Sequence, residues 1–198
     1  MKLIKFALLT FIIFGSNMLF AQKELELSQP GYFEFGDLSN LESGEKASEV
    51  LLEESLIKAI SDMSEEKDPG ISKLLSQLKF IHVNSFGITE KNTKNIDEKM
   101  KLFDTELLGK NWKRIVSTRD KKTNLSVYIK SERPSKIEGL VILAKRKNAE
   151  ATFVNIVGNI DLKSLGKLGQ KFHIPSLDKF KESIGENEED NTSVEPKK

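Results

Sequence analysis

Basic side chains gather in one stretch of the sequence, residues 110–147, and they suggest the clearest binding chemistry. The stretch contains twelve lysines and arginines against three acids, Asp120, Glu132 and Glu138. Ammonium and guanidinium groups bind carboxylates, phosphates and sulfates, so this composition favours an anionic partner. Trp112 and Tyr128 stand among the bases and would add aromatic contact area. The predicted partner-binding surface consists of Lys113, Arg119, Lys121, Lys122, Tyr128, Lys130 and Arg133.

Two other interpretations of these bases remain open. Lysine and arginine on an outer sheet face or an edge hairpin keep a domain soluble and prevent pairing with other strands. The segment 181–198 has six acids and three lysines, so it is a candidate to fold back onto the bases. The whole chain carries a formal charge of only +1, which argues against a nucleic-acid partner. The expected partners are an envelope protein, an anionic glycan or a lipid head group.

The residues of catalytic and metal sites are scarce. The chain has no cysteine and two histidines, His82 and His173, which do not stand in HExxH or His-x-His spacing. Neither a Gly-x-Ser-x-Gly elbow nor a calcium-loop pattern is present in the sequence. We therefore expect no catalytic residue, metal or cofactor, and a non-catalytic binding module. The alternative is an enzyme or small-ligand protein whose site is assembled from residues distant in sequence.

A glycine turn near the end of the chain resembles a phosphate-binding loop at first sight. The stretch TFVNIVGNIDLKSLGKLG, residues 152–169, has one glycine at the turn, Gly158, and no Gly-Lys-Ser/Thr element after it. Asp161, the expected N-cap of the next helix, places a negative charge where a phosphate would bind. The prediction is structural: Gly158 permits a sharp exit from a buried strand.

The same region carries a family resemblance. The stretches EGLVILAKRKNAEATF and VNIVGNIDLKSLGKL resemble the domain of unknown function 4252 family, which comprises small exported proteins common in the Bacteroidota. The resemblance covers roughly residues 30–172. It implies no activity and no catalytic residue. Some family members resemble lipoproteins, but this chain lacks the cysteine that lipid attachment requires.

Hydrophobic periodicity predicts an α+β fold, with helices packed on one face of a mostly antiparallel sheet. The expected order is β-α-α-β-α-β-β-β-β-α. The expected elements are a strand at 32–38, helices at 45–64 and 69–78, a strand at 78–88, a helix at 92–109, strands at 111–120, 124–131, 137–147 and 151–158, and a helix at 162–172.

The first 21 residues are typical of a secretory signal peptide. Lys2 and Lys5 precede an apolar run over residues 6–14, and Ala21 ends the segment. The run is about half of the ~20 residues that a spanning helix needs. Removing the two lysines leaves 29 basic residues against 30 acids. We expect a periplasmic or extracellular protein without a membrane anchor, with a polar lead-in at 22–29, one domain at 30–174 and an acidic disordered tail at 175–198.

Overall fold

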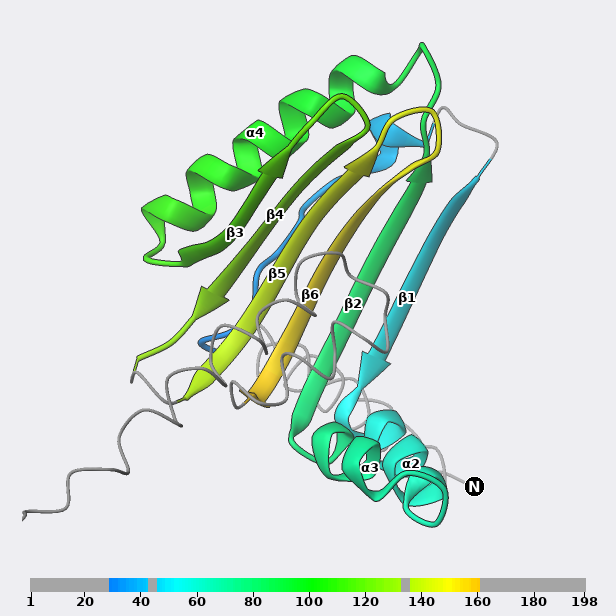
Figure 1. The fold of residues 1–198 in the computed structure, drawn as a ribbon, viewed down its shortest axis with the longest axis vertical. Coiled ribbons are helices and arrows are strands. Elements are labelled where there is room, and N and C mark those ends of the chain that lie inside the picture. The colour runs from blue at the N-terminus through cyan, green and yellow to red at the C-terminus, as the bar shows by residue number, and fades with distance from the viewer. Residues whose placement is uncertain (1–28, 43–45, 133–135, 161–198) are drawn as a thin grey trace, which may run out of the picture.

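The computed structural model describes residues 29–42, 46–132 and 136–160 (Figure 1). The predicted signal peptide, the helix at 162–172, the acidic tail and Arg133 lie outside these residues. The described part contains one short 3₁₀ helix, η1 (Ser39–Leu41), three α-helices and six strands. The predicted α+β class is confirmed, and so is the predicted order of elements as far as the last described strand.

The six strands form one antiparallel sheet (Figure 1). They are β1 (Ala47–Glu53), β2 (Leu78–Gly87), β3 (Lys113–Arg119), β4 (Thr123–Lys130), β5 (Ile137–Arg146) and β6 (Glu150–Ile160). Their order across the sheet is β1-β2-β6-β5-β4-β3, so β1 and β3 are the edge strands. Four of the five adjacent pairs join strands that are consecutive in sequence, and three of these pairs form the run of hairpins from β3 to β6.

The strand β1 occupies residues for which the sequence predicts a helix. The predicted helix at 45–64 is correct only from α2 (Glu54–Ser64) onward, because residues 47–53 pair with β2. Val50 and Leu51 fit helical spacing with Ala47, but together with Leu52 they also form the short apolar run of a strand. Pairing with β2 decides between the two, because the backbone groups of β2 need hydrogen-bond partners.

The predicted strand at 32–38 is wrong, although its alternation of buried and exposed residues is correct. Phe33 and Phe35 are buried and Glu34 is exposed, but the segment joins no ladder. Its backbone is held by a side chain instead. The buried amide of Asn155 accepts a hydrogen bond from Phe33 N (3.0 Å) and donates one to the Gly31 carbonyl (3.0 Å). The segment therefore packs onto a sheet face and not at an edge.

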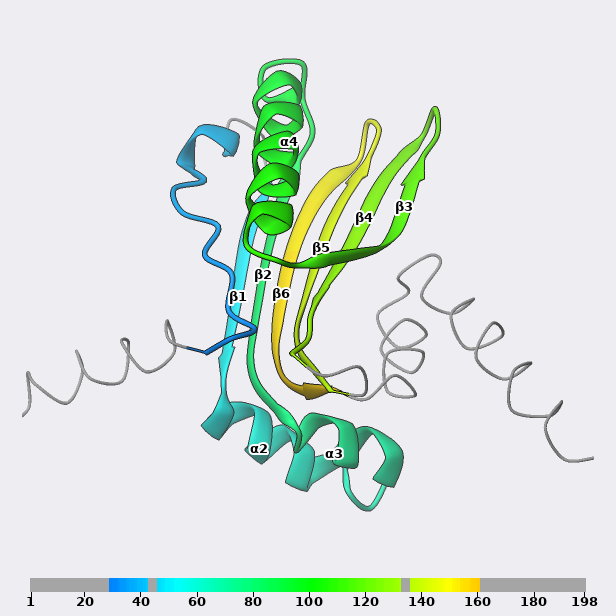
Figure 2. The ribbon, with the colours of Figure 1, turned by 90° about the vertical axis from the view of Figure 1, so that its left-hand side faces the viewer.

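The first face of the sheet is covered by that segment and by α4 (Thr93–Gly109), which lies along it (Figure 2). Ile96, Met100, Phe103 and Leu107 follow a 4, 3, 4 spacing in the sequence, which is typical of one helix face, and they form the buried side of α4. Phe103 lies at the centre of an aromatic cluster, with its ring 5.6 Å from Phe33, 5.3 Å from Phe35 and 5.5 Å from Phe153. These contacts fix the helix against the middle of the sheet.

The second face of the sheet is apolar. One row of branched side chains crosses all six strands through consecutive Cα pairs. In order from β3 to β1 it consists of Val116, Val127, Ile142, Val154, Val83 and Val50. The helices α2 and α3 (Pro69–Leu75) lie at one end of the sheet, where Ile57 and Leu74 join the cluster of this face (Figure 1).

Gly158 does not end its strand, because β6 continues to Ile160. A Cβ at this position would lie 2.5 Å from the Gln77 carbonyl oxygen and 2.7 Å from Leu78 Cα. The glycine thus permits the close approach of β6 to the start of β2, and the predicted exit at this residue is wrong.

Candidate functional site

A hollow lined by basic residues lies between α4 and the β3–β4 hairpin; we call it the basic groove. The tip of the hairpin curves away from α4 (Figure 2), and the groove encloses about 750 Å³. Three of its lining residues are acids: Asp97, Asp104 and Asp120. Seven are bases: Lys101, Arg114, Arg119, Lys121, Lys122, Lys145 and Lys147. This excess makes the groove attractive to anions.

The floor of the groove is a hydrogen-bonded triad of Tyr128, Asp104 and Arg114. The Tyr128 hydroxyl donates to Asp104 Oδ1 at 2.5 Å, and Arg114 Nη1 donates to the same oxygen at 2.8 Å. Burial and the neighbouring Asp104 raise the pKa of the Tyr128 hydroxyl above its usual 10.0. The hydroxyl therefore stays protonated as a donor at neutral pH, and Arg114 keeps a partly exposed guanidinium.

A second ion pair connects β5 to α4. Lys145 Nζ lies 2.6 Å from Asp97 Oδ1, and only 14% of the Lys145 side chain is exposed. Together with the Arg114–Asp104 pair it ties two strands to the helix. The two α4 carboxylates that line the groove, Asp97 and Asp104, are thus both paired with bases.

The rim of the groove carries bases that make no ion pair with any residue in the described ranges. Asp120 forms no ion pair with them within 4.0 Å; its carboxylate accepts hydrogen bonds from Lys122 N (2.6 Å) and Thr123 N (2.8 Å) in the hairpin turn. These two bonds, the first more than the second, lower the pKa of Asp120. The unpaired bases are Lys101, Arg119, Lys121, Lys122 and Lys147.

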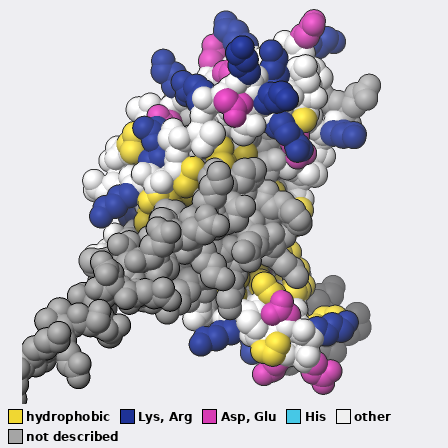
Figure 3. Space-filling model, viewed as in Figure 1, with side chains coloured by type: hydrophobic (Ala, Val, Ile, Leu, Met, Phe, Trp, Pro, Cys, Tyr) yellow, Lys and Arg dark blue, Asp and Glu magenta, His cyan; other side chains and the backbone are white. Residues whose placement is uncertain are grey.

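Basic side chains also gather over the end of the molecule that carries the β3–β4 and β5–β6 turns (Figure 3). The Lys147 amide donates to the Lys122 carbonyl at 2.8 Å, which holds the two turns side by side. Lysines from both turns therefore converge on one rim. An anion in the groove would meet bases from β3, β5, the two turns and α4.

The groove contains four of the predicted surface residues: Arg119, Lys121, Lys122 and Tyr128. Lys113 and Lys130 lie outside it. Lys113 pairs with Ile129, whose side chain belongs to the second face, and Lys130 Nζ donates to the Lys110 carbonyl at 2.6 Å.

The rings of Tyr128 and Trp112 do not form part of the partner-binding surface. The predicted contribution of Tyr128 and Trp112 as contact area is wrong, because both residues are buried in the core under α4. The Tyr128 ring packs inward, and its hydroxyl is the part that contacts the groove residue Asp104. The ring of a tyrosine in a strand is large and apolar, so it packs into the core where it can. Here the aromatic cluster provides the packing partners.

Sequence reasoning did not select Lys101, Arg114 or Lys145 for the site. For two of them, the spacing in the sequence indicates the position. Lys145 follows Leu143 at the two-residue period of the α4-facing side of β5, and Lys101 stands between Asp97 and Asp104 on one side of α4. Arg114 has no such signal, because a register shift between Arg114 and Val116 sets which face it joins.

The His82 ring lies between those of Phe35 and Phe80, and hydrogen bonds hold it in place. Its Nε2 lies 2.7 Å from Glu49 Oε1 and 3.0 Å from Asn84 Nδ2, and its ring lies 5.9 Å from that of Phe35. Among the described residues, no group of three or more histidines, cysteines, aspartates or glutamates is arranged to hold a metal ion.

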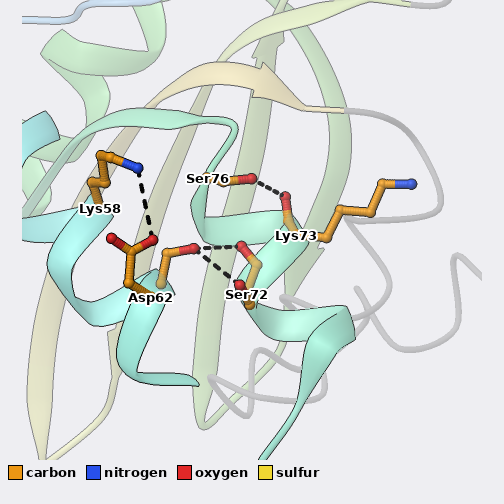
Figure 4. Close-up of polar contacts among 6 residues, drawn as sticks. Lys58, Asp62, Ser72, Lys73 and Ser76 are labelled. Atoms are coloured by element: carbon orange, nitrogen blue, oxygen red, sulfur yellow. Dashed lines mark hydrogen bonds and ion pairs between the residues drawn. The ribbon is translucent and has the colours of Figure 1, made fainter. Parts of the chain in front are cut away.

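Two buried serines lie at the corner between α2 and α3 (Figure 4). The Ser61 hydroxyl donates to the Ser72 carbonyl at 2.8 Å and lies 3.2 Å from the Ser72 hydroxyl. On the surface beside them, Lys58 and Asp62 form an ion pair at 3.7 Å, and the Ser76 hydroxyl donates to the Lys73 carbonyl at 2.9 Å. The contacts between the two serines fasten α2 to α3 and satisfy buried hydroxyls, whereas the other two contacts are local to one helix.

Comparisons with known proteins give a family without an assigned activity. No curated protein and no solved structure matches the chain. Of the described helices, none combines the length and apolar character needed to span a bilayer. A family model, the domain of unknown function DUF4252, matches residues 41–168, which extend from η1 through β6 and beyond. With the whole sheet inside that match, the chain belongs to the DUF4252 family.

Proposed function

We propose that this is an exported envelope protein without catalytic activity, which binds an anionic partner in the basic groove. The observation that carries the proposal is the set of five rim bases without a carboxylate partner among the described residues. Free bases around a hollow raise the local concentration of anions and orient them. A carboxylate-, phosphate- or sulfate-bearing protein, glycan or lipid head group has the chemistry to bind there.

The floor of the groove supports the same proposal. Arg114 is fixed by Asp104, which also accepts a hydrogen bond from the buried Tyr128 hydroxyl, so the guanidinium is held in place before a partner arrives. A rigid donor loses less conformational entropy on binding than a flexible lysine does. The expected arrangement is a fixed floor that orients the anion and a mobile rim of lysines that attracts it.

A small anionic ligand is the second candidate, and the size of the groove favours it. The volume of about 750 Å³ falls within the range of small-molecule sites, roughly 300–1,000 Å³. A small ligand would depend most on Arg114 at the floor. An extended polyanion would depend most on the rim, because it contacts more bases at once.

Export of the protein is proposed from the order of charges, apolar run and Ala21 in residues 1–21. The intact mass of the native protein tests it. A mass that corresponds to a chain beginning near Gln22 is expected, and a mass that includes Met1 contradicts it.

Binding is tested with fluorescent polyglutamate, heparin and phosphatidylglycerol vesicles titrated into the full protein. Reversal of three rim charges, Arg119→Glu with Lys121→Glu and Lys122→Glu, should weaken binding at least about tenfold. The matched control reverses three exposed bases outside the groove, Lys67, Lys73 and Lys113. Equal losses in both triple variants, or no binding of any probe, would contradict the proposal. A loss caused by Arg114→Gln but not by the rim triple would favour the small ligand.

A further inference from the structure

The edge strand β1 lies at the opposite edge of the sheet from the groove hairpin, and it exposes apolar side chains. It is seven residues long, Ala47–Glu53, and no described strand pairs with its outer side. The strand contains no lysine, arginine or proline, and its pairing with β2 shows no bulge. Val50 and Leu51 are 46% and 48% exposed on its two faces. Exposed apolar edges of this kind are templates for another strand.

The backbone groups available for such pairing can be assigned. The Gly87 amide donates to the Lys46 carbonyl at 2.7 Å, so the hydrogen-bonding groups of Lys46 face β2. Since the direction alternates along a strand, those of Ser48, Val50 and Leu52 also face β2. The N–H and C=O groups of the odd-numbered residues therefore face outward: Ala47, Glu49, Leu51 and Glu53.

We propose that β1 pairs antiparallel with β1 of a second copy of this chain, around a two-fold axis at Val50. The pairing would join two six-stranded sheets into one continuous sheet. It uses a surface distinct from the basic groove and does not rest on the function proposed for that groove.

The charges on β1 favour this register over the two neighbouring ones. Centring the axis on Glu49 places that carboxylate opposite its copy, and centring it on Leu51 places Glu49 opposite Glu53. Like charges opposite each other destabilise a strand pair. Centring the axis on Val50 places Glu49 opposite Leu51 and Ala47 opposite Glu53, which opposes no two acids. Both of these are pairs of outward-facing residues, so the backbone groups match as well.

The apolar row of the second face supports the second copy as the occupant. The row from Val116 to Val50 crosses the whole sheet and ends at an exposed side chain. In the register centred on Val50, this valine meets its own copy as a non-hydrogen-bonded pair, with Cα atoms about 4.5 Å apart. The row then continues from one sheet into the other without interruption. A partner with another sequence would have to supply a matching apolar residue at that position, whereas a second copy always does.

The opposite edge gives a contrast within the same molecule. Strand β3 begins and ends with bases, Lys113 and Arg119, and its register shift lies between Arg114 and Val116. Charges and bulges of this kind protect an edge from pairing. Both edges are exposed, but they differ in the features that control association. The proposal therefore rests on the apolar side chains and the regular pairing of β1, and not on exposure alone.

Sedimentation equilibrium of the full protein tests the association. The chain should form a dimer, and Val50→Lys should raise its dissociation constant at least about tenfold, because it opposes two ammonium groups. Leu108→Lys is the matched control, since Leu108 on α4 has the same exposed fraction of 46%. A protein that stays monomeric overturns the proposal, and so does a dimer that Val50→Lys leaves unchanged.

The register is tested by crosslinking, which does not depend on how a charged variant folds. Because the chain has no cysteine, Val50→Cys introduces a single thiol. Mild oxidation should form a disulfide dimer rapidly, since Cα atoms about 4.5 Å apart lie within the range of a disulfide. Leu51→Cys and Leu108→Cys should crosslink much more slowly. Equal rates for the three variants would overturn the two-fold register, as would faster crosslinking of Leu51→Cys.

Discussion

The two edge strands of the sheet, β1 and β3, show opposite solutions to the same physical problem. Each leaves one row of backbone groups without a strand partner among the described residues. Strand β3 carries Lys113, Arg114 and Arg119, whereas β1 carries two acids and exposes Val50 and Leu51. An edge rich in bases attracts anions and repels a similar strand, whereas an apolar edge favours pairing.

The difference shows how one small sheet can have two kinds of interaction surface. The helix α4 lies against the β3 side, where it forms one wall of the groove with Lys101 and Asp104. The groove therefore depends on the distance between a helix and a hairpin. The β1 edge needs only the strand itself, which is fixed along its whole length by β2.

The largest expected effect comes from loosening the groove wall with Phe103→Ala. Phe103 is buried among Phe33, Phe35 and Phe153, so its removal should lower the free energy of unfolding by about 3–5 kcal/mol. Urea unfolding measures this, with Leu102→Ala as control because Leu102 is 47% exposed. Binding in the groove should weaken while association through β1 persists. Loss of both functions to the same extent would show that the two surfaces are not independent.

A smaller effect is expected at the floor of the groove. Tyr128→Phe removes the hydrogen bond to Asp104 and should cost about 1 kcal/mol of stability at neutral pH. The folded protein raises the pKa of Tyr128 above 10.0, so this contribution is complete below pH 10 and is lost as the pH rises through the higher folded value. The stability of the wild-type protein should therefore fall more steeply above pH 10 than that of Tyr128→Phe.

The chain has two tyrosines, so the Tyr32→Phe variant isolates the titration of Tyr128. Its tyrosinate absorbance should rise with a midpoint above 10.0 in the folded protein. A midpoint at or below the usual pKa would contradict the proposed floor, because the hydroxyl would then lack the burial and the carboxylate that raise it.

The smallest effect in free energy, and the one that separates the two edges most directly, is the response to salt. Raising the ionic strength from about 0.05 to 0.5 M shortens the Debye length from roughly 14 to 4 Å and should weaken anion binding several-fold. Association through the apolar β1 edge should change less than about twofold, since burial of apolar surface is not screened. Parallel binding and sedimentation measurements across this range check it, and equal salt dependence would mean that β1 association is also electrostatic.

Sequence reasoning located the basic groove and the β1 edge with different success. The basic residues of the hairpin were found from composition, because the twelve bases within residues 110–147 can be counted in the sequence alone. The β1 edge was missed, because the apolar residues of residues 47–53 satisfy helical and strand spacing at once. The spacing of apolar residues identifies an element well only where it fits the period of a helix or of a strand, but not both.

The aromatic residues show a similar limit. Tyr128 and Trp112 stand among bases in the sequence, which favoured a mixed aromatic and basic surface. In the folded chain both lie under α4, because the sheet needs large apolar side chains on the face that the helix covers. Neighbours in sequence along a strand point to opposite faces, so proximity in the sequence says little about proximity at a surface.

By itself, the sequence determined the α+β class, the run of hairpins from β3 to β6, and the buried stripe of α4. Each follows from the spacing of hydrophobic residues along the sequence, because the period of that spacing indicates a helix or a strand. Only the tertiary structure decided that residues 47–53 form an edge strand, that Asn155 holds residues 31–33 on a sheet face, and that Lys101 of α4 shares a groove with the β3–β4 hairpin. These features depend on hydrogen bonds and contacts between residues far apart in the chain, and no local period encodes such distances.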